Sequence, residues 1–367
     1  MRISVAPHAC EPQKKPWTVL YYGSGDNLLS PYMQQNLKDM EAVGSTDQVN
    51  IVTQFDAENQ GATRRLMLKG DAPAGALASP VVEDLGQTNM ARPETLSDFI
   101  KWGVEKYPAD HYMVVMAGFG NGWSGAMIDV GDRTLMSLPD IHQALQSAQA
   151  ATGKKIDVLG FDAELMGMAE VAHELRDDAG YLVASEHSEK KERWSYASAL
   201  STAFPQISAS CGAPAPVDVA KAFVTGTADR PKGVPTMAAY DLRQEPRLAH
   251  SIRSLSAAIQ ASSLSGEAVG RLKADTQHYL IPSYVDLHDL CTRIVEEPAA
   301  EPKLKAAAIE CQQAIAGMVI AERHSKWLRH SHGVSIDLQY GYPDYAAMRF
   351  AQDTQWNAAQ DRLARDL

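Results

Sequence analysis

Short apolar segments alternate with amphipathic segments along the first two thirds of this chain, and this alternation restricts the fold more than any other feature. Each apolar run has the length of a strand, and the segments between them place apolar residues at helical spacing. Strands that are apolar throughout and are separated by helices indicate a mostly parallel sheet covered on both faces. The predicted strands are 17–22, 49–55, 64–68 at an edge, 112–117, 156–161 and 181–185, and the predicted helices are 31–43, 94–107, 138–151 and 165–176.

The pattern changes after one more apolar run at 235–240. Long Ala-rich helices are predicted there at 242–262, 283–297 and 303–322, followed by a late strand at 333–338 and a final helix near 350–366. The length of 367 residues fits about two domains. We therefore expect a flexible lead (1–16), an α/β domain (17–241) and a helical C-terminal subdomain (242–367) that returns one strand to the core.

The charge balance makes a nucleic-acid-binding surface over the whole molecule improbable. Lys and Arg total 34 and Asp and Glu total 45, which gives a net charge of −11. The four cysteines (Cys10, Cys211, Cys291 and Cys311) include no CxxC pair, and the pair His330 and His332 has no assured third ligand. We expect no metal ion and no cofactor.

The sequence gives no sign of membrane insertion. No apolar run approaches the roughly 20 residues needed to span a bilayer. The first 17 residues contain three prolines and Glu11, where a signal peptide needs an unbroken apolar stretch. These observations predict a cytoplasmic protein, with export without a cleavable signal as the alternative. The oligomeric state is left open.

Two strand ends are the places where chemistry is expected, because sites in open α/β sheets form outside the carboxyl ends of the strands. One is the glycine-rich segment 118–123 (GFGNGW), and the other is 161–167 (FDAELMG). Taken alone, such glycine-rich exits are as compatible with plain turns as with a site.

Together with other motifs, these strand ends resemble the clostripain family of cysteine peptidases (peptidase family C11, in the caspase-like clan). The resemblance implies a caspase-like three-layer α/β sandwich plus a helix-rich C-terminal part. It is collinear from about residue 17 to 360. The segments that carry it are 17–27 (WTVLYYGSGDN), 37–44 (LKDMEAVG), 108–112 (PADHY), 120–123 (GNGW), 160–163 (GFDA), 165–167 (LMG), 185–186 (SE), 194–196 (WSY), 284–287 (YVDL) and 350–356 (FAQDTQW).

Family members cleave peptides with a His-Cys dyad, and the resemblance places this dyad at residues 119 and 164. This sequence has Phe119 and Glu164 at those positions. A phenyl ring cannot transfer a proton, and a carboxylate is a poor nucleophile toward an amide compared with a thiolate. We therefore predict no catalytic residues, with Phe119 and Glu164 as degenerate dyad positions.

The resemblance also implies that parts of the substrate pocket are retained. Asp162 matches the acidic residue that helps bind an Arg or Lys side chain in the family, and Gly120 matches the residue whose amide helps hold the oxyanion. Ser185 and Glu186 match the strand end beside the pocket. The alternatives are that Asp162 caps a helix beginning at Leu165, and that Ser185 and Glu186 are a plain strand end.

These features favour a catalytically inactive pseudopeptidase that binds a basic (Arg/Lys) peptide or a protein partner. One alternative is an enzyme with altered chemistry, in which Asp162 and Glu164 act as a carboxylate pair. Another is a cysteine endopeptidase cleaving after Arg or Lys, which needs a Cys and a His from elsewhere to enter the cleft.

Overall fold

The computed structural model describes residues 14–58, 62–70, 77–189, 194–205, 212–226 and 235–364. Its centre is a nine-stranded sheet in the order β12-β10-β9-β8-β5-β1-β2-β3-β4. The five inner strands β9, β8, β5, β1 and β2 run parallel, and both flanks are antiparallel. The strands are β1 (Lys15–Gly25), β2 (Val49–Ala57), β3 (Thr63–Met67), β4 (Val81–Asp84), β5 (Ala109–Ala117), β8 (Ile156–Asp162), β9 (Ala179–Ala184), β10 (Thr236–Asp241) and β12 (Val319–His324).

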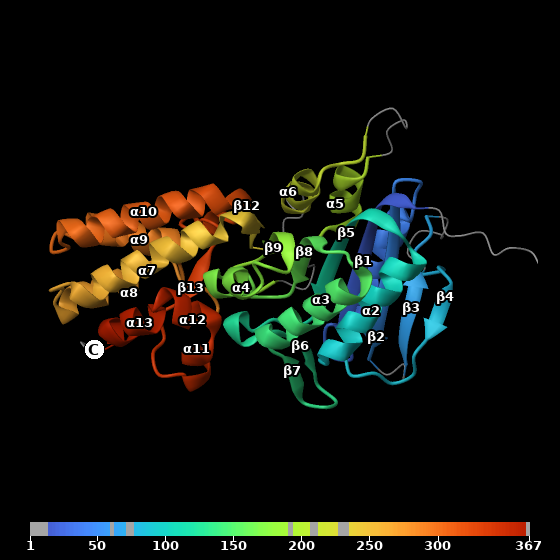
Figure 1. The fold of residues 1–367 in the computed structure, drawn as a ribbon, viewed down its shortest axis with the longest axis horizontal. Helices are drawn as coiled ribbons and strands as arrows, with labels where there is room; N and C mark the ends of the chain where they lie inside the picture. Colours follow the sequence, from blue (N-terminus) through green and yellow to red (C-terminus); the bar gives the residue numbers. More distant parts are fainter. Residues whose placement is uncertain are drawn as a thin grey trace, which may run out of the picture.

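Helices cover both faces of the sheet, as the apolar strands require (Figure 1). Successive residues of β1 point to opposite faces. Leu20 and Tyr22 belong to the core shared with α2 and α3, whereas Val19 and Tyr21 belong to the core shared with α1, α5 and α6. These helices are α1 (Ser30–Val43), α2 (Pro93–Lys106), α3 (Leu138–Thr152), α5 (Tyr196–Ala203) and α6 (Pro216–Gly226), with the short α4 (Ala169–Glu174) beside the C-terminal part. The predicted α/β class is therefore confirmed.

The C-terminal part is a set of helices beyond β10 and β12, seen at the left of Figure 1. It also contains a small two-stranded sheet of β11 (Tyr284–Asp286) and β13 (Ser335–Asp337), and a second hairpin, β6 (Ala126–Asp129) and β7 (Thr134–Met136), lies in the N-terminal part. The helices are α7 (Glu245–Ala261), α8 (Gly266–Asp275), α9 (Leu287–Glu296), α10 (Pro302–Met318), α11 (Pro343–Ala347), α12 (Arg349–Thr354) and α13 (Trp356–Ala364).

Several predicted elements differ in the structure, each because tertiary contacts override the local pattern. Residues 319–322, predicted as the end of a helix, belong to the edge strand β12, which pairs with β10. The late strand pairs with β11 and not with the large sheet. The final helix is divided, because Gln355 between α12 and α13 has a φ of 57°.

The N-terminal half shows three smaller differences. β3 is not an edge strand, because the short exposed β4 pairs with it. The helix predicted at 165–176 is only the six-residue α4. β1 begins at Lys15, inside the predicted lead, whose residues 1–13 lie outside the described part of the chain. Among the described residues, no helix has the length and hydropathy to cross a bilayer.

Candidate functional site

The two strand ends singled out by the sequence lie side by side. β5 and β8 are parallel neighbours in register up to the pair Ala117 and Asp162, and the Gly118 N–H donates a 3.2 Å hydrogen bond to the Asp162 carbonyl. The loops remain in contact beyond the strands, since a Cβ added to Gly120 would lie 2.0 Å from the backbone oxygen of Glu164. The residue after Phe119 and the backbone of Glu164 therefore touch at the carboxyl edge of the sheet.

The loop that carries Phe119 is fixed by its own hairpin. The carbonyl oxygen of the half-buried Phe119 accepts a 2.8 Å hydrogen bond from the Met127 N–H, and the Asn121 N–H donates 2.9 Å to the Gly125 carbonyl. Gly122 has a φ of 62°, and a Cβ added to it would lie 2.6 Å from the ring of Tyr284, so there is no room for a side chain. The loop is thereby packed against the C-terminal part.

The loop that carries Glu164 has a strained backbone. Leu165 adopts a φ of 67°, a left-handed conformation that costs a non-glycine residue roughly 1–3 kcal/mol. The end of β9 holds it, because the Leu165 N–H donates to the His187 carbonyl (3.3 Å) and the Gly167 N–H donates to the Ser185 carbonyl (2.7 Å). The position of Glu164 is therefore coupled to the position of the β9 end.

Asp162 is fully buried between the sheet and the α1 and α5 layer. Its Oδ2 accepts hydrogen bonds from Asn36 Nδ2 (3.0 Å) and the Tyr196 hydroxyl (2.9 Å). The alternative that Asp162 caps the next helix is wrong, because α4 begins at Ala169, after Met168. The carboxylate is instead fixed in orientation by donors from α1 and α5.

Ser185 and Glu186 both contact other parts of the protein. The Ser185 hydroxyl lies 3.0 Å from Thr236 Oγ1, and Glu186 Oε1 accepts a 2.7 Å hydrogen bond from the Tyr279 hydroxyl. Burial, followed by the charge of Asp286, raises the pKa of Glu186 well above its ordinary value. Ligand binding by Gly120, Ser185 and Glu186 stays a prediction.

The described cysteines lie far along the chain from these loops. Cys291 on α9 and Cys311 on α10 are fully buried in the helical part, and burial raises the pKa of the Cys291 thiol. Cys10 and Cys211 lie outside the described residues.

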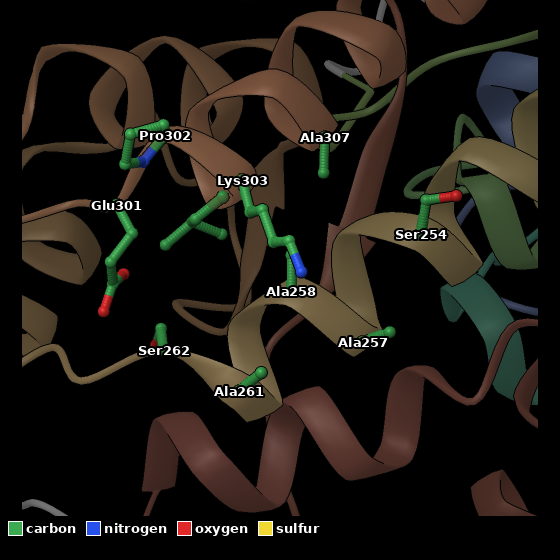
Figure 2. Close-up of a pocket in the computed structure, with 10 residues that line it drawn as sticks. Ser254, Ala257, Ala258, Ala261, Ser262, Glu301, Pro302, Lys303 and Ala307 are labelled. Atoms are coloured by element: carbon green, nitrogen blue, oxygen red, sulfur yellow. The ribbon is translucent and has the colours of Figure 1, made fainter.

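A cavity of about 710 Å³ lies between α7 and α10 (Figure 2). Ala257, Ala258 and Ala261 of α7 line one side, the extended side chain of Lys303 lies opposite them (Figure 2), and Leu304 also lines the cavity. None of the predicted site residues lines this cavity.

Sequence reasoning missed three residues that shape the site. Asn36 and Tyr196 orient Asp162, and the backbone of His187 supports Leu165. His187 directly follows the Ser185-Glu186 pair, so its place at a strand end was a usable signal. Asn36 lies 126 residues from Asp162, and no local pattern connects them.

Comparisons with known proteins support the family and the fold that the sequence predicts. The profile of the clostripain family of C11 peptidases matches residues 21–358. Clostripain from Hathewaya histolytica is 26% identical over an alignment of 196 residues, and the match covers 44% of this chain and 36% of that protein, about a third of the curated relative.

Solved structures show the same fold. An inactive zymogen C11 protease from Parabacteroides distasonis superposes with a TM-score of 0.69 at 22% identity, over 94% of this chain and 99% of that one. A secreted C11 cysteine protease from Bacteroides thetaiotaomicron, in complex with an irreversible peptide inhibitor, gives a TM-score of 0.70 at 18% identity over the same shares. Since the family profile covers most of the sequence, this chain belongs to the clostripain family.

Proposed function

We propose that this protein is a clostripain-family pseudopeptidase that binds a basic (Arg/Lys) peptide or a protein partner without cleaving it. The observation that carries the proposal is the contact between the two strand-end loops, at which the family places its His-Cys dyad and this chain has Phe119 and Glu164. Neither side chain can perform the attack by a thiolate or the protonation by an imidazole that peptide cleavage requires.

The neighbouring charges support a basic ligand. Asn36 and Tyr196 hold the Asp162 carboxylate in one orientation, and Glu164 follows two residues later on the same loop. The buried Asp162 and the nearby Glu164 place negative charge at this end of the sheet, and such charge would attract a guanidinium. The similarity to a relative that was solved with a peptide inhibitor supports a peptide as the ligand.

The two alternatives have less support. A carboxylate pair would require Asp162 to exchange protons with a substrate, yet this side chain is fully buried and Oδ2 accepts two hydrogen bonds. A working cysteine peptidase would require a thiol in the cleft, whereas the described thiols of Cys291 and Cys311 are enclosed between helices.

Isothermal titration calorimetry with a short blocked peptide containing one Arg tests the binding claim. The wild type should bind this peptide and should not bind the same peptide with citrulline, which is neutral, in place of Arg. Asp162→Asn should weaken the binding about tenfold, because it removes a buried negative charge that attracts the guanidinium where the effective dielectric constant is low. Glu310→Gln, which removes a charge from the exposed face of α10, should bind like the wild type.

Two other results would revise the proposal. If only Phe119→Ala binds the Arg peptide, the phenyl ring closes the pocket and the working surface of the native protein lies elsewhere. If the wild type, Phe119→Ala and Asp162→Asn all fail to bind it, the peptide cleft should be abandoned in favour of a scaffold role.

A further inference from the structure

A group of buried polar side chains joins the end of β9 to the C-terminal part. Glu186 extends β9 by two residues and is 1% exposed, and Asp286 at the start of α9 is fully buried. The Tyr279 hydroxyl lies 2.7 Å from Glu186 Oε1 and 3.4 Å from Asp286 Oδ2. Two carboxyl groups therefore share one buried site, and they come from segments 100 residues apart.

The two carboxyl groups have very different surroundings. Asp286 accepts hydrogen bonds from the backbone N–H groups of Asp289 (2.6 Å) and His332 (2.5 Å), and its Oδ1 lies 3.1 Å from His332 Nδ1. These donors suit a carboxylate. Among the described residues, Glu186 accepts a hydrogen bond only at Oε1, from the Tyr279 hydroxyl. If Glu186 is ionised, its buried Oε2 has no hydrogen-bond partner within the described part of the chain. An ionised Glu186 would leave a charged oxygen buried beside a second carboxylate.

We propose that Glu186 is protonated in the folded protein and donates the proton on Oε2 to Asp286, so that a carboxyl–carboxylate hydrogen bond latches the end of β9 to the C-terminal part. The proton satisfies the oxygen that otherwise has no partner, and it leaves one negative charge for the donors around Asp286. We refer to Glu186, Asp286 and Tyr279 as the carboxyl latch. The inference is independent of whether the cleft binds a peptide.

The other groups near the latch fit this protonation state. Burial and the adjacent Asp286 raise the pKa of Glu186. Burial of His332 lowers its pKa, but the hydrogen bond to Asp286 and the negative charge of Asp286 outweigh this effect, so the pKa of His332 is raised. The groups that face Glu186 from the packed elements are Tyr240 of β10, Glu322 of β12, Tyr279, Asp286, and the Ser331 hydroxyl, which lies 2.9 Å from the Tyr279 hydroxyl; the His187 ring lies edge-on to Tyr279 at 5.9 Å. Of the charged groups there, Asp286 and Glu322 are negative and favour the neutral acid, whereas a protonated His332 beside Asp286 balances the one negative charge that remains.

The latch acts on the candidate cleft through the backbone. Ser185 and His187, on either side of Glu186, accept the hydrogen bonds of Gly167 and Leu165 in the loop that carries Glu164. Loss of the proton would place two negative charges together, and separating them requires the β9 end to move from Asp286. The Glu164 loop would lose its support at the same time. The latch should therefore release as the pH rises.

Unfolding by urea from pH 4.5 to pH 9 tests the proposal with Glu186→Gln, which keeps the shape and supplies a permanent N–H donor to Asp286. Glu186 binds a proton in the folded state at pH values where the unfolded chain has lost it. The folding equilibrium constant of the wild type should therefore fall relative to that of Glu186→Gln as the pH rises. The fall should begin at about pH 4.5, reach up to tenfold per pH unit, and continue until Glu186 ionises in the folded protein. Glu310→Gln should stay parallel to the wild type. A ratio that is constant with pH, or one that changes in favour of the wild type, would overturn the proposal.

Two measurements complete the test. Infrared spectra at pH 7 should retain a protonated-carboxyl band in Glu170→Gln, a background that removes the other glutamic acid of the described residues whose pKa burial raises. The absence of this band would show that Glu186 is ionised, even if Glu186→Gln fails to fold. Hydrogen exchange at Leu165 and Gly167 should accelerate at high pH in the wild type relative to Glu186→Gln. If the exchange rates of Leu165 and Gly167 in the wild type and in Glu186→Gln keep the same ratio at all pH values, the carboxyl latch is not coupled to the loop that carries Glu164.

Discussion

The indole nitrogen of Trp123 donates a 2.8 Å hydrogen bond to the carboxylate of Asp337, 214 residues further along the chain. Trp123 ends the glycine-rich segment 118–123 that contains Phe119, and Asp337 ends β13 in the C-terminal part. The backbone oxygen of Asp337 in turn accepts hydrogen bonds from Trp356 Nε1 (2.8 Å) and Gln360 Nε2 (2.9 Å). The C-terminal part therefore helps to hold the loop that carries Phe119.

Replacing Trp123 with Phe should destabilise the protein by about 1–3 kcal/mol, because the buried Asp337 carboxylate loses a donor. Urea unfolding measures this change. Tyr340→Phe, which changes an exposed tyrosine three residues beyond the end of β13, should change the stability by less than about 0.5 kcal/mol. Equal effects of the two substitutions would show that the Trp123–Asp337 bond contributes nothing of its own.

Replacing Gly120 with Ala should destabilise the protein severely, because the new methyl group would lie 2.0 Å from the Glu164 oxygen and 2.9 Å from its nitrogen. The matched control is Gly270→Ala in α8, where nothing lies within 4 Å of an added Cβ. That substitution should stabilise the helix by about 0.5–1 kcal/mol. Thermal unfolding of both variants decides the point, and a Gly120→Ala protein as stable as the wild type would disprove the close contact between the two loops.

Glu170 gives a second pH-dependent prediction. Burial raises its pKa to about 8 from 4.5, although the hydrogen bond from the Asp337 N–H opposes the shift. The folded state therefore holds a proton that the unfolded state has lost, and this contribution to stability declines as the pH rises from about 4.5 to about 8. Glu170→Gln lacks the titration, so its stability relative to the wild type should increase across that window and level off above it. Urea unfolding at pH 5, 7 and 9 measures the trend. A difference that does not change with pH would mean that Glu170 is ionised in the fold.

The sequence predicted the parts of the fold that depend on local pattern. The apolar runs at 17–22, 49–55, 112–117, 156–161 and 181–185 do share one sheet, because continuous apolar strands are stable only when buried on both faces. The adjacency of the strand ends at 118–120 and 162–164 also follows from that arrangement.

Long-range pairing could not be predicted in the same way. The Ala-rich run through residue 321 continues a helical pattern, and only the partner β10 makes its end a strand. Glu186 was predicted as pocket wall or strand end, whereas its buried partners Tyr279 and Asp286 come from a segment about 100 residues away. Nothing in the local sequence around either carboxyl group indicates the other.

Peptide hydrolysis is the most direct test of the pseudopeptidase proposal. The purified protein should release no product from Arg- or Lys-containing peptide substrates, and an Arg-directed electrophile should form no adduct with any of its cysteines. The double variant Phe119→His/Glu164→Cys should gain at least a trace of cleavage after Arg if Asp162 and Gly120 keep their family roles. Turnover by the wild type that a thiol-alkylating agent abolishes would contradict the proposal.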